Sequence, residues 1–232
     1  MGARSVPQLP FDFGAVPSHA DEDFLVAASN EEAHAWIRRW PDWPRPGLAV
    51  YGPPGCGKTH LGQIWRRRAS AAQLTGADLG QADPPAILAR CSALLIDELT
   101  AATFTSAAER RLLHLYNLLA ERKGHLLLCA AEPPARWPIQ LADLRSRLNA
   151  LPAVAIQQPD DGLLRLLLAK LFSDRQLTVD TDMVEFALRR IERSFDAARR
   201  LAEAVDRAAL TARRKPSLAL MREVLQAMDG PD

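Results

Sequence analysis

The sequence predicts an α/β protein whose parallel sheet is flanked by helices and followed by a small all-α domain. From Gly47 to Leu144, short apolar segments alternate with helical stretches, the order that produces a parallel sheet covered on both faces. A glycine-rich motif, G-x-x-x-x-G-K-T, joins the first apolar segment to the next helical stretch. After Pro159, β-branched residues become sparse and only helical patterns remain.

The composition is that of a folded globular protein. Of the 232 residues, 48% are hydrophobic and 25% charged, which excludes disordered and fibrous classes. The 29 Lys and Arg residues balance the 28 Asp and Glu residues, so we do not expect the protein to coat DNA or RNA. Without a long apolar run or an export signal, a soluble cytoplasmic protein is expected, with no membrane partner. Scattered Cys56, Cys91 and Cys129 indicate reduced thiols.

Three regions are expected along the chain. Residues 1–20 contain several prolines and a glycine with no helical or strand period, which predicts a mobile tail. Residues 21–158 are predicted to form the α/β domain and residues 159–232 the helical domain. No residues follow Asp232 that could form a DNA-binding module, so DNA contact is expected to be delegated to partners.

The elements of the α/β domain follow from capping residues and apolar spacing. Ser29-Asn30-Glu31-Glu32 has the spacing of a capping box that opens a helix towards Trp40. A second capping box, Ser106 with Glu109, opens a helix that extends to about Glu121. The buried face of that helix is predicted to be Leu112, Leu113, Tyr116, Leu119 and Ala120. Strands are predicted at Leu48–Tyr51, Ala93–Ile96, Leu126–Ala130 and Ala153–Ile156.

The helical domain is predicted to contain four helices. They are expected at Leu163–Phe172, at Met183–Ile191, behind Ser194 at Phe195–Leu210, and from Ser217, the last with Leu218, Met221, Val224 and Leu225 facing inward.

The glycine-rich motif has the composition of a phosphate-binding loop (P-loop). It reads Gly52-Pro53-Pro54-Gly55-Cys56-Gly57-Lys58-Thr59. Its glycines allow several backbone N–H groups to point at phosphate oxygens, and the helix that follows adds its dipole. Lys58 supplies a charge to the β and γ phosphates, and Thr59 offers a hydroxyl to Mg²⁺. ADP or ATP with Mg²⁺ is the expected cofactor, and the resident nucleotide stays open.

A pair of carboxylates ends the second predicted strand. In Ala93-Leu94-Leu95-Ile96-Asp97-Glu98, Asp97 would hold Mg²⁺ through its water shell. Glu98 could then act as a general base on an attacking water.

Together with these motifs, further segments resemble the AAA+ ATPases of the bacterial replication-initiator (DnaA-related) family, and most closely its short regulatory members without a DNA-binding domain. The resembling segments are Asp23-Phe24-Leu25-Val26 with Ser29-Asn30, the P-loop from Tyr51 to His60-Leu61, Leu94–Glu98, Pro133-Pro134 and Asp143–Leu148. The resemblance implies an AAA+ fold with a helical lid. It also implies that Phe24, Leu25, Val26 and His60 lie at the nucleotide.

By this resemblance, Arg147 in Asp143-Leu144-Arg145-Ser146-Arg147-Leu148 is an arginine finger. A guanidinium at a helix end can neutralise charge on a γ-phosphoryl group held by a neighbouring subunit. The alternative is that Arg145 and Arg147 are ordinary surface residues of an arginine-rich chain.

The tail resembles the peptide with which replication factors bind the DNA polymerase sliding clamp. Gln8-Leu9-Pro10-Phe11-Asp12-Phe13 has a glutamine followed by two large apolar residues. Phe11 and Phe13 would enter a clamp pocket while Gln8 bonds at its rim. Alternatively, both phenylalanines pack on the protein's own surface.

Two positions depart from the family pattern. The polar sensor at the end of the strand Leu126–Ala130 falls on Ala131, with Glu132 beside it, and the sensor arginine of the lid falls on Asp196. Arg193, Arg199 and Arg200 lie about one helical turn away and are alternative sensors. These departures predict weak intrinsic hydrolysis.

Other features are assigned to structure. The histidines lack metal-ligand spacing. Trp36, Trp40 and Trp43 are interpreted as a hydrophobic joint between the first helix and the sheet, with a partner patch as the alternative. Arg66-Arg67-Arg68 is interpreted as a solvated face, with DNA contact as the alternative.

The leading hypothesis is a nucleotide-binding adaptor that docks on the DNA-loaded sliding clamp and stimulates ATP hydrolysis by the replication initiator DnaA, preventing re-initiation. An autonomous AAA+ ATPase that loads a helicase or remodels replication complexes is the alternative, and a DNA-recruitment factor is a third. Self-association as a homo-oligomer stays open.

Overall fold

A single five-stranded parallel sheet forms the centre of the α/β part. The structure, a computed structural model, describes residues 24–44 and 46–228. The strand order is β2-β3-β4-β1-β5. The strands are β1 (Gly47–Tyr51), β2 (Ala72–Thr75), β3 (Ala93–Leu99), β4 (His125–Ala130) and β5 (Ala153–Ala155). All pairs are parallel, so the predicted α/β class is confirmed.

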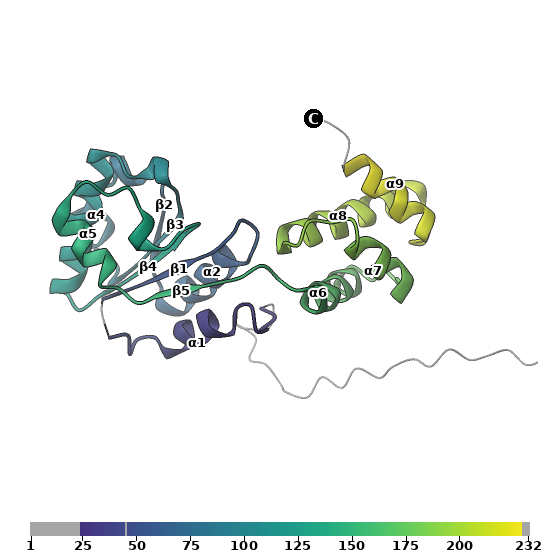
Figure 1. Ribbon diagram of the computed structural model, residues 1–232, viewed down its shortest axis with the longest axis horizontal. Helices are drawn as coiled ribbons and strands as arrows, with labels where there is room; N and C mark the ends of the chain where they lie inside the picture. The colour runs from purple at the N-terminus through teal and green to yellow at the C-terminus, as the bar shows by residue number, and fades with distance from the viewer. Residues whose placement is uncertain (1–23, 45, 229–232) are drawn as a thin grey trace, which may run out of the picture.

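The central strands are almost continuously apolar because helices cover both faces of the sheet. Alternate residues of β3 enter different clusters: Leu94 and Ile96 pack with α4 (Ser106–Glu121), whereas Leu95 packs with α1 (Glu31–Arg39) and α2 (Lys58–Ala69). Figure 1 shows α4 on one side of the sheet with α5 (Ala142–Asn149), and α1 and α2 on the other. A short helix, α3 (Pro84–Ile87), completes this part.

The edge strand β2 was not predicted. Its sequence, Ala72-Gln73-Leu74-Thr75, is half polar, and none of its residues is fully buried. Among the residues that the structure describes, β3 is its one partner, so β2 forms an edge of the sheet. An edge strand this short has too few apolar residues for periodicity to reveal it.

Neither predicted capping box forms. Asn30 precedes α1, but its side-chain amide bonds the preceding loop: Oδ1 accepts from Ala27 N–H and Nδ2 donates to the Leu25 carbonyl, both at 2.9 Å. Thr105, not Ser106, caps α4 by accepting from Ala108 N–H. On α4, Leu112, Tyr116 and Leu119 are buried as predicted. Leu113 is half-buried and packs against the same core. The predicted face was wrong at Ala120, which is exposed, and it omitted Leu115, which is buried.

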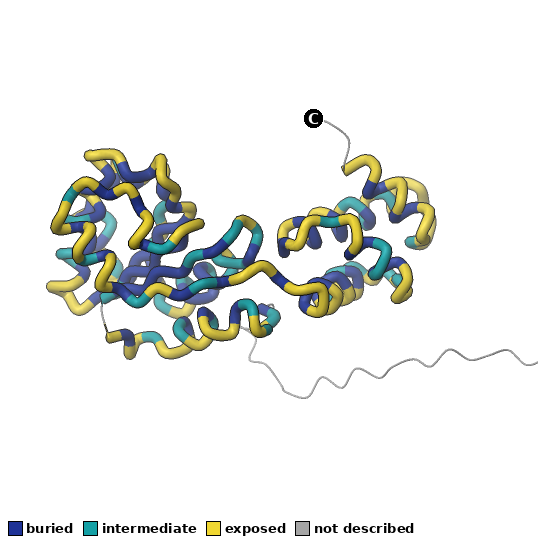
Figure 2. The backbone as a smooth tube through the Cα atoms, viewed as in Figure 1, coloured by how far each residue is buried: buried dark blue, intermediate teal, exposed yellow. Residues whose placement is uncertain are grey.

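The helical part contains α6 (Asp161–Asp174), α7 (Thr181–Leu188), α8 (Phe195–Ala212) and α9 (Leu218–Met228). It has its own apolar cluster, visible as buried inner faces in Figure 2. Asp160, Asp180 and Ser194 cap the first three helices through their side chains. The four predicted helices are confirmed, but Leu218 is exposed, and Leu220 is buried in its place.

The tryptophan joint is confirmed. Trp43 stacks on Trp65 of α2 with ring centres 5.5 Å apart, and Trp40 and Trp43 both contact His125 edge-on. Arg68 closes the joint, because its guanidinium donates to carbonyls at the end of α1, those of Ile37, Arg38 and Trp40. Arg67 and Arg68 are exposed, as expected for a solvated face, and Arg68 also caps the end of α1. Within residues 24–44 and 46–228, no helix is long and apolar enough to cross a membrane.

Candidate functional site

The P-loop adopts a conformation that only its glycines tolerate. It connects β1 to α2 and includes Gly55 and Gly57 at φ +67° and +100°. A Cβ on Gly55 would lie 2.7 Å from the Cβ of Ser194, and one on Gly57 would face the rings of Phe195 and Phe24. The glycines therefore allow both the left-handed backbone and the close approach of the helical part.

Lys58 is held on the inner side of this loop. Its Nζ donates to the carbonyls of Gly52 and Pro53 at 2.8 and 2.7 Å. Thr59, the next residue of α2, is exposed, and Pro54 is exposed at the tip of the loop. The loop thus presents a compact ammonium beside the N-terminus of a helix, an arrangement that attracts anions.

Cys56 and Cys129 are packing residues next to the loop. Burial is the main cause that raises the pKa of the Cys56 thiol. Burial also raises the pKa of Cys129, where the Asp97 carboxylate adds to the effect and the Lys58 ammonium opposes it. Asp97 and Lys58 are therefore both near enough to the buried Cys129 thiol to influence its charge. Neither cysteine is an activated nucleophile, because burial disfavours the thiolate.

The two carboxylates at the end of β3 occupy an irregular stretch of strand. The β3–β4 register shifts between Ile96 and Leu99, and Glu98 has a left-handed φ of +58°. Asp97 is only 3% exposed, and its Oδ1 accepts the Glu98 N–H at 2.8 Å. Glu98 is exposed. The irregularity aims the two consecutive side chains differently, so one carboxylate is fixed inside and the other reaches solvent.

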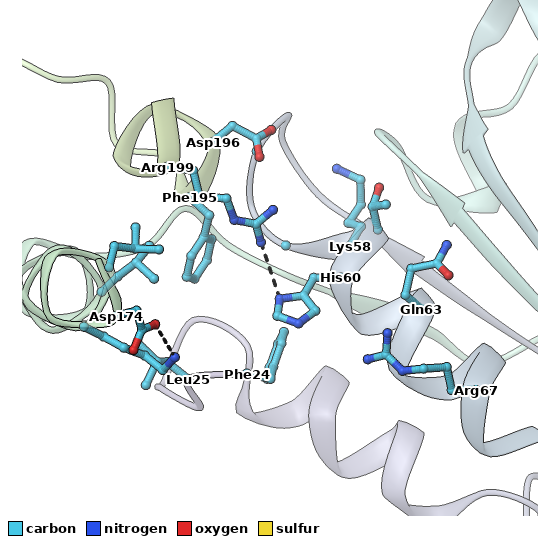
Figure 3. Close-up of a pocket in the computed structure, with 16 residues that line it drawn as sticks. Phe24, Leu25, Lys58, His60, Gln63, Arg67, Asp174, Phe195, Asp196 and Arg199 are labelled. Atoms are coloured by element: carbon cyan, nitrogen blue, oxygen red, sulfur yellow. Dashed lines mark hydrogen bonds and ion pairs between the residues drawn. The ribbon is translucent and has the colours of Figure 1, made fainter. Parts of the chain in front are cut away.

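A cavity of about 610 Å³ opens between the P-loop and the helical part. Figure 3 shows His60 lying between Phe24 and Arg199, with Lys58 and Asp196 at the loop. The lining combines predicted and unpredicted residues: Phe24, Leu25, Gly55, Gly57, Lys58, Thr59, His60, Gln63, Arg67, Leu167, Lys170, Leu171, Asp174, Phe195, Asp196 and Arg199. Its charged groups come from α2, α6 and α8, so the pocket forms only where the α/β part and the helical part meet.

The segment before α1 forms one wall of this cavity. Phe24 is buried, stacks on His34 with ring centres 5.6 Å apart and meets His60 edge-on at 5.5 Å. The Asn30 amide holds the turn that follows through Leu25 and Ala27. Val26, which the resemblance placed at the nucleotide, is 48% exposed and is not among the residues that line the cavity.

Helix α8 docks directly on the P-loop. The Phe195 N–H donates to the Gly55 carbonyl at 2.8 Å. The Asp196 carboxylate lies beside Gly55, with an oxygen 3.4 Å from where a Cβ of that residue would be. One turn later, Arg199 Nη2 lies 3.5 Å from His60 Nδ1. The beginning of α8 thus brings a carboxylate to the loop and an arginine to His60 in the first turn of α2.

The other two sensor candidates lie outside the cavity lining. Arg193 forms an ion pair with Asp161 at 2.9 Å, and Arg200 is exposed further along α8. Of the four candidates, Asp196 and Arg199 are the ones that line the cavity.

The two arginines of α5 lie away from the cavity. Arg147 Nε bonds Asp143 Oδ1 at 2.9 Å, and Arg145 Nη1 donates to the Ile139 carbonyl. The Arg147 side chain is 40% exposed. Figure 1 places α5 at the end of the α/β part farthest from α6–α9. Arg147 therefore faces solvent at a distance from the chain's own P-loop.

The clamp-binding residues and the metal site are the two predictions that remain to be placed. Gln8, Leu9, Phe11 and Phe13 lie outside the described residues. Within the part of the chain that is described, no group of three or more His, Cys, Asp or Glu side chains could hold a metal ion by itself.

Comparison with known proteins relates the chain to replication initiators. No protein-family model matches it. It is 29% identical over 205 residues to the chromosomal replication initiator protein DnaA of Thermomicrobium roseum, covering 78% of this chain and 43% of that protein. The chain thus spans less than half the length of this initiator.

Solved structures share the fold. Domain III of the Thermotoga maritima replication initiation protein DnaA superposes with a TM-score of 0.79 at 18% identity, covering 93% of this chain and 100% of that domain. A replication initiator DnaA bound to AMPPCP and single-stranded DNA gives a TM-score of 0.68 at 18% identity, covering 90% and 68%. The chain therefore has an AAA+ fold and is related in sequence to DnaA.

Proposed function

We propose that the chain binds an adenine nucleotide, ADP or ATP, in the cavity between the P-loop and the helical part. The observation that carries this proposal is the convergence of Lys58, the Phe24 wall and the first turn of α8 on one cavity. Backbone N–H groups of the loop would hold the phosphates, and Lys58 would exchange its carbonyl partners for phosphate oxygens. Phe24 and Leu25 would contact the base.

The metal that accompanies such a nucleotide is Mg²⁺. Thr59 and Asp97 fit its chemistry, because Thr59 places an exposed hydroxyl in the first turn of α2 and Asp97 places a buried carboxylate near the end of β3. When bound, Mg²⁺ neutralises charge on the phosphates. Glu98, exposed next to Asp97, would orient or deprotonate water.

The chain's role in replication is proposed to be that of an Hda-type regulator. Arg147 would act in trans on ATP held by the initiator DnaA, because it faces solvent far from its own cavity. The tail from Gln8 to Phe13 would dock on the DNA-loaded sliding clamp. Two weak contacts, one to the clamp and one to the initiator, would then reinforce each other through effective concentration.

One assay tests this role. Initiator ATP hydrolysis is measured with clamp-loaded DNA and the intact chain, Gln8→Ala or Arg147→Ala. Both variants should lower the stimulation. Arg147→Ala removes the finger, so its loss should persist at every chain concentration. Gln8→Ala weakens clamp docking, so its loss should appear only at low chain concentration. Full stimulation by Arg147→Ala contradicts the trans mechanism, and clamp co-purification of Gln8→Ala contradicts the tail assignment.

The second candidate function is autonomous ATP hydrolysis, which the exposure of Glu98 beside Asp97 favours. It predicts linear phosphate release by the purified chain without a partner, abolished in Glu98→Gln. The acid at position 196, beside the P-loop, favours the regulator over this alternative, because a carboxylate there repels a triphosphate.

A further inference from the structure

Helix α4 carries a buried carboxylate with an unusual partner. Glu109 is 3% exposed, and its two oxygens accept the N–H groups of Gln140 and Leu141 at 2.9 and 2.7 Å. These N–H groups immediately precede α5, whose N-cap residue, Leu141, provides no side-chain cap. Glu109 therefore caps α5 from another helix, satisfies donors that would otherwise be orphaned, and places a negative charge at the positive end of α5.

The same face of α4 meets α5 again two turns later. There the Tyr116 ring lies under the Arg147 guanidinium, whose carbon is 5.8 Å from the ring centre. Tyr116 is itself buried, so its ring is a fixed surface. Glu109 and Tyr116 thus hold the beginning of α5 and the arginine near its end from one rigid helix.

The contacts of Arg147 leave its phosphate-binding atoms available. Asp143 accepts the Nε–H, and the guanidinium carbon lies over the Tyr116 ring. Within residues 24–44 and 46–228, neither Nη1 nor Nη2 has a hydrogen-bond partner. Those two nitrogens form the planar fork that binds a phosphate in two-point fashion. The side chain is therefore restrained without using the atoms that would contact a ligand.

The contacts that Arg147 makes with Asp143 and Tyr116 add little to the stability of the fold. A half-exposed ion pair contributes little to the free energy of unfolding, because solvent screens it and ordering the side chains costs entropy. Restricting the guanidinium before a partner arrives has a larger consequence, since the ordering cost is then not incurred at the moment of binding.

We propose that Glu109 and Tyr116 are positioning residues that aim the Arg147 fork at a triphosphate bound by a second P-loop protein. The inference rests on the proposed trans role of Arg147. It adds that α4 sets the direction of the arginine, so the stimulated rate depends on residues that never touch the phosphate.

The test compares three variants, Tyr116→Leu, Tyr116→Phe and Arg147→Ala, in the initiator hydrolysis assay with the full chain and clamp-loaded DNA. Tyr116→Leu is expected to lower the maximal stimulated rate about tenfold, with the half-saturating chain concentration unchanged. Tyr116→Phe keeps the ring and should retain the rate within about twofold. ADP affinity of the chain's own site should be the same in all three, which controls for folding.

The outcomes separate the inference from the proposed function. If Arg147→Ala stimulates fully, the proposed function fails whatever Tyr116 does. If Arg147→Ala abolishes stimulation while Tyr116→Leu retains it, the positioning inference is overturned. A readout without any partner is the NMR signal of the Arg147 Nε–H, whose ring-current shift should be lost in Tyr116→Leu and kept in Tyr116→Phe.

Glu109 is tested by hydrogen exchange. Glu109→Gln removes the charge and places an amide donor opposite a backbone N–H, so the Gln140 and Leu141 amides should exchange about tenfold faster. The stimulated rate should fall while ADP affinity is kept. Unchanged exchange and an unchanged rate would overturn the role of Glu109.

Discussion

The cavity beside the P-loop and the arginine on α5 both suit phosphate, but they are built in opposite ways. Segments far apart in the sequence form the cavity: the wall at Phe24, the loop around Lys58 and the start of α8. Arg147 lies on the outer side of a single helix, α5, where Glu109 and Tyr116 of α4 contact the beginning of the helix and the arginine. A cavity lined by several segments can be completed within one chain, whereas an exposed guanidinium fork needs a second molecule. Variants of the two regions should therefore fail in different assays.

The largest effect is expected from Lys58→Ala. Removing the ammonium removes charge-assisted hydrogen bonds to phosphate, so affinity for Mg·ADP should fall by about a hundredfold. Titration calorimetry with Mg·ADP measures it. Lys215→Ala, at an exposed lysine of the helical part, is the matched control and should bind normally. Equal affinity of the Lys58→Ala variant and the intact chain for Mg·ADP would contradict the proposal that the nucleotide binds in this cavity.

A smaller loss is expected when the helical part is pushed off the loop. In Gly55→Ala, the new methyl group would meet Ser194 at 2.7 Å on a backbone with φ +67°. We expect Mg·ADP affinity to fall about tenfold and the free energy of unfolding to fall by about 1–3 kcal/mol.

The matched control for this variant is Gly80→Ala. A Cβ on Gly80 has only Thr105 nearby, at 3.9 Å. Thermal unfolding and calorimetry on both variants distinguish a local clash from a general effect of replacing glycine. Similar losses in the two variants would show that docking of α8 on the loop is irrelevant to binding.

Asp196→Asn should change nucleotide preference more than nucleotide affinity. The Asp196 carboxylate lies beside the P-loop, so neutralising it should favour the more negative ligand. The ratio of ATP to ADP affinity is expected to rise about three- to fivefold, with screening by salt reducing the effect. Asp182→Asn, an exposed acid on α7, is the control. An unchanged ratio would mean that the phosphates stay out of reach of α8.

The features that could be predicted from the sequence are those determined by local pattern. Strand β1 is apolar throughout and β4 is apolar after His125, and the P-loop has a spacing that few other structures use. The four C-terminal helices were predicted because capping residues such as Asp180 and Ser194 precede strong apolar periodicity. Assigning Ser106 instead of Thr105 as a cap is the expected error when two hydroxyl residues adjoin.

The features that could not be predicted depend on contacts across the fold. Glu109 has the spacing of a capping residue for its own helix, yet its partners lie at Gln140 and Leu141. Asp174 and Lys170 line the cavity because the fold of the helical part places α6 beside it. Nothing in their local sequence predicts that they are cavity residues. Arg68 is exposed as predicted, but its bonds to carbonyls at the end of α1 have no signal in the local sequence.

The smallest effect is expected from Asp143→Asn. This variant should affect the Arg147 region slightly and the P-loop cavity not at all. The Asp143–Arg147 pair is half-exposed, so the free energy of unfolding should change by no more than about 1 kcal/mol. Because the asparagine oxygen can still accept from Nε–H and the Tyr116 ring stays in place, initiator stimulation should fall by only about twofold. Mg·ADP affinity should be unchanged, because Asp143 lies outside the cavity lining.

Adding salt sharpens the result for Asp143→Asn. In the intact chain, salt should weaken the Asp143–Arg147 pair and bring the stimulated rate closer to that of the variant. In the variant, the rate should depend less on salt over the same range, after correction for partner binding. A tenfold loss in Asp143→Asn would instead assign the aiming of Arg147 to α5 itself. Helix α4 would then only stabilise the fold, and the direction of the Arg147 side chain would depend on its neighbour Asp143 in the same helix.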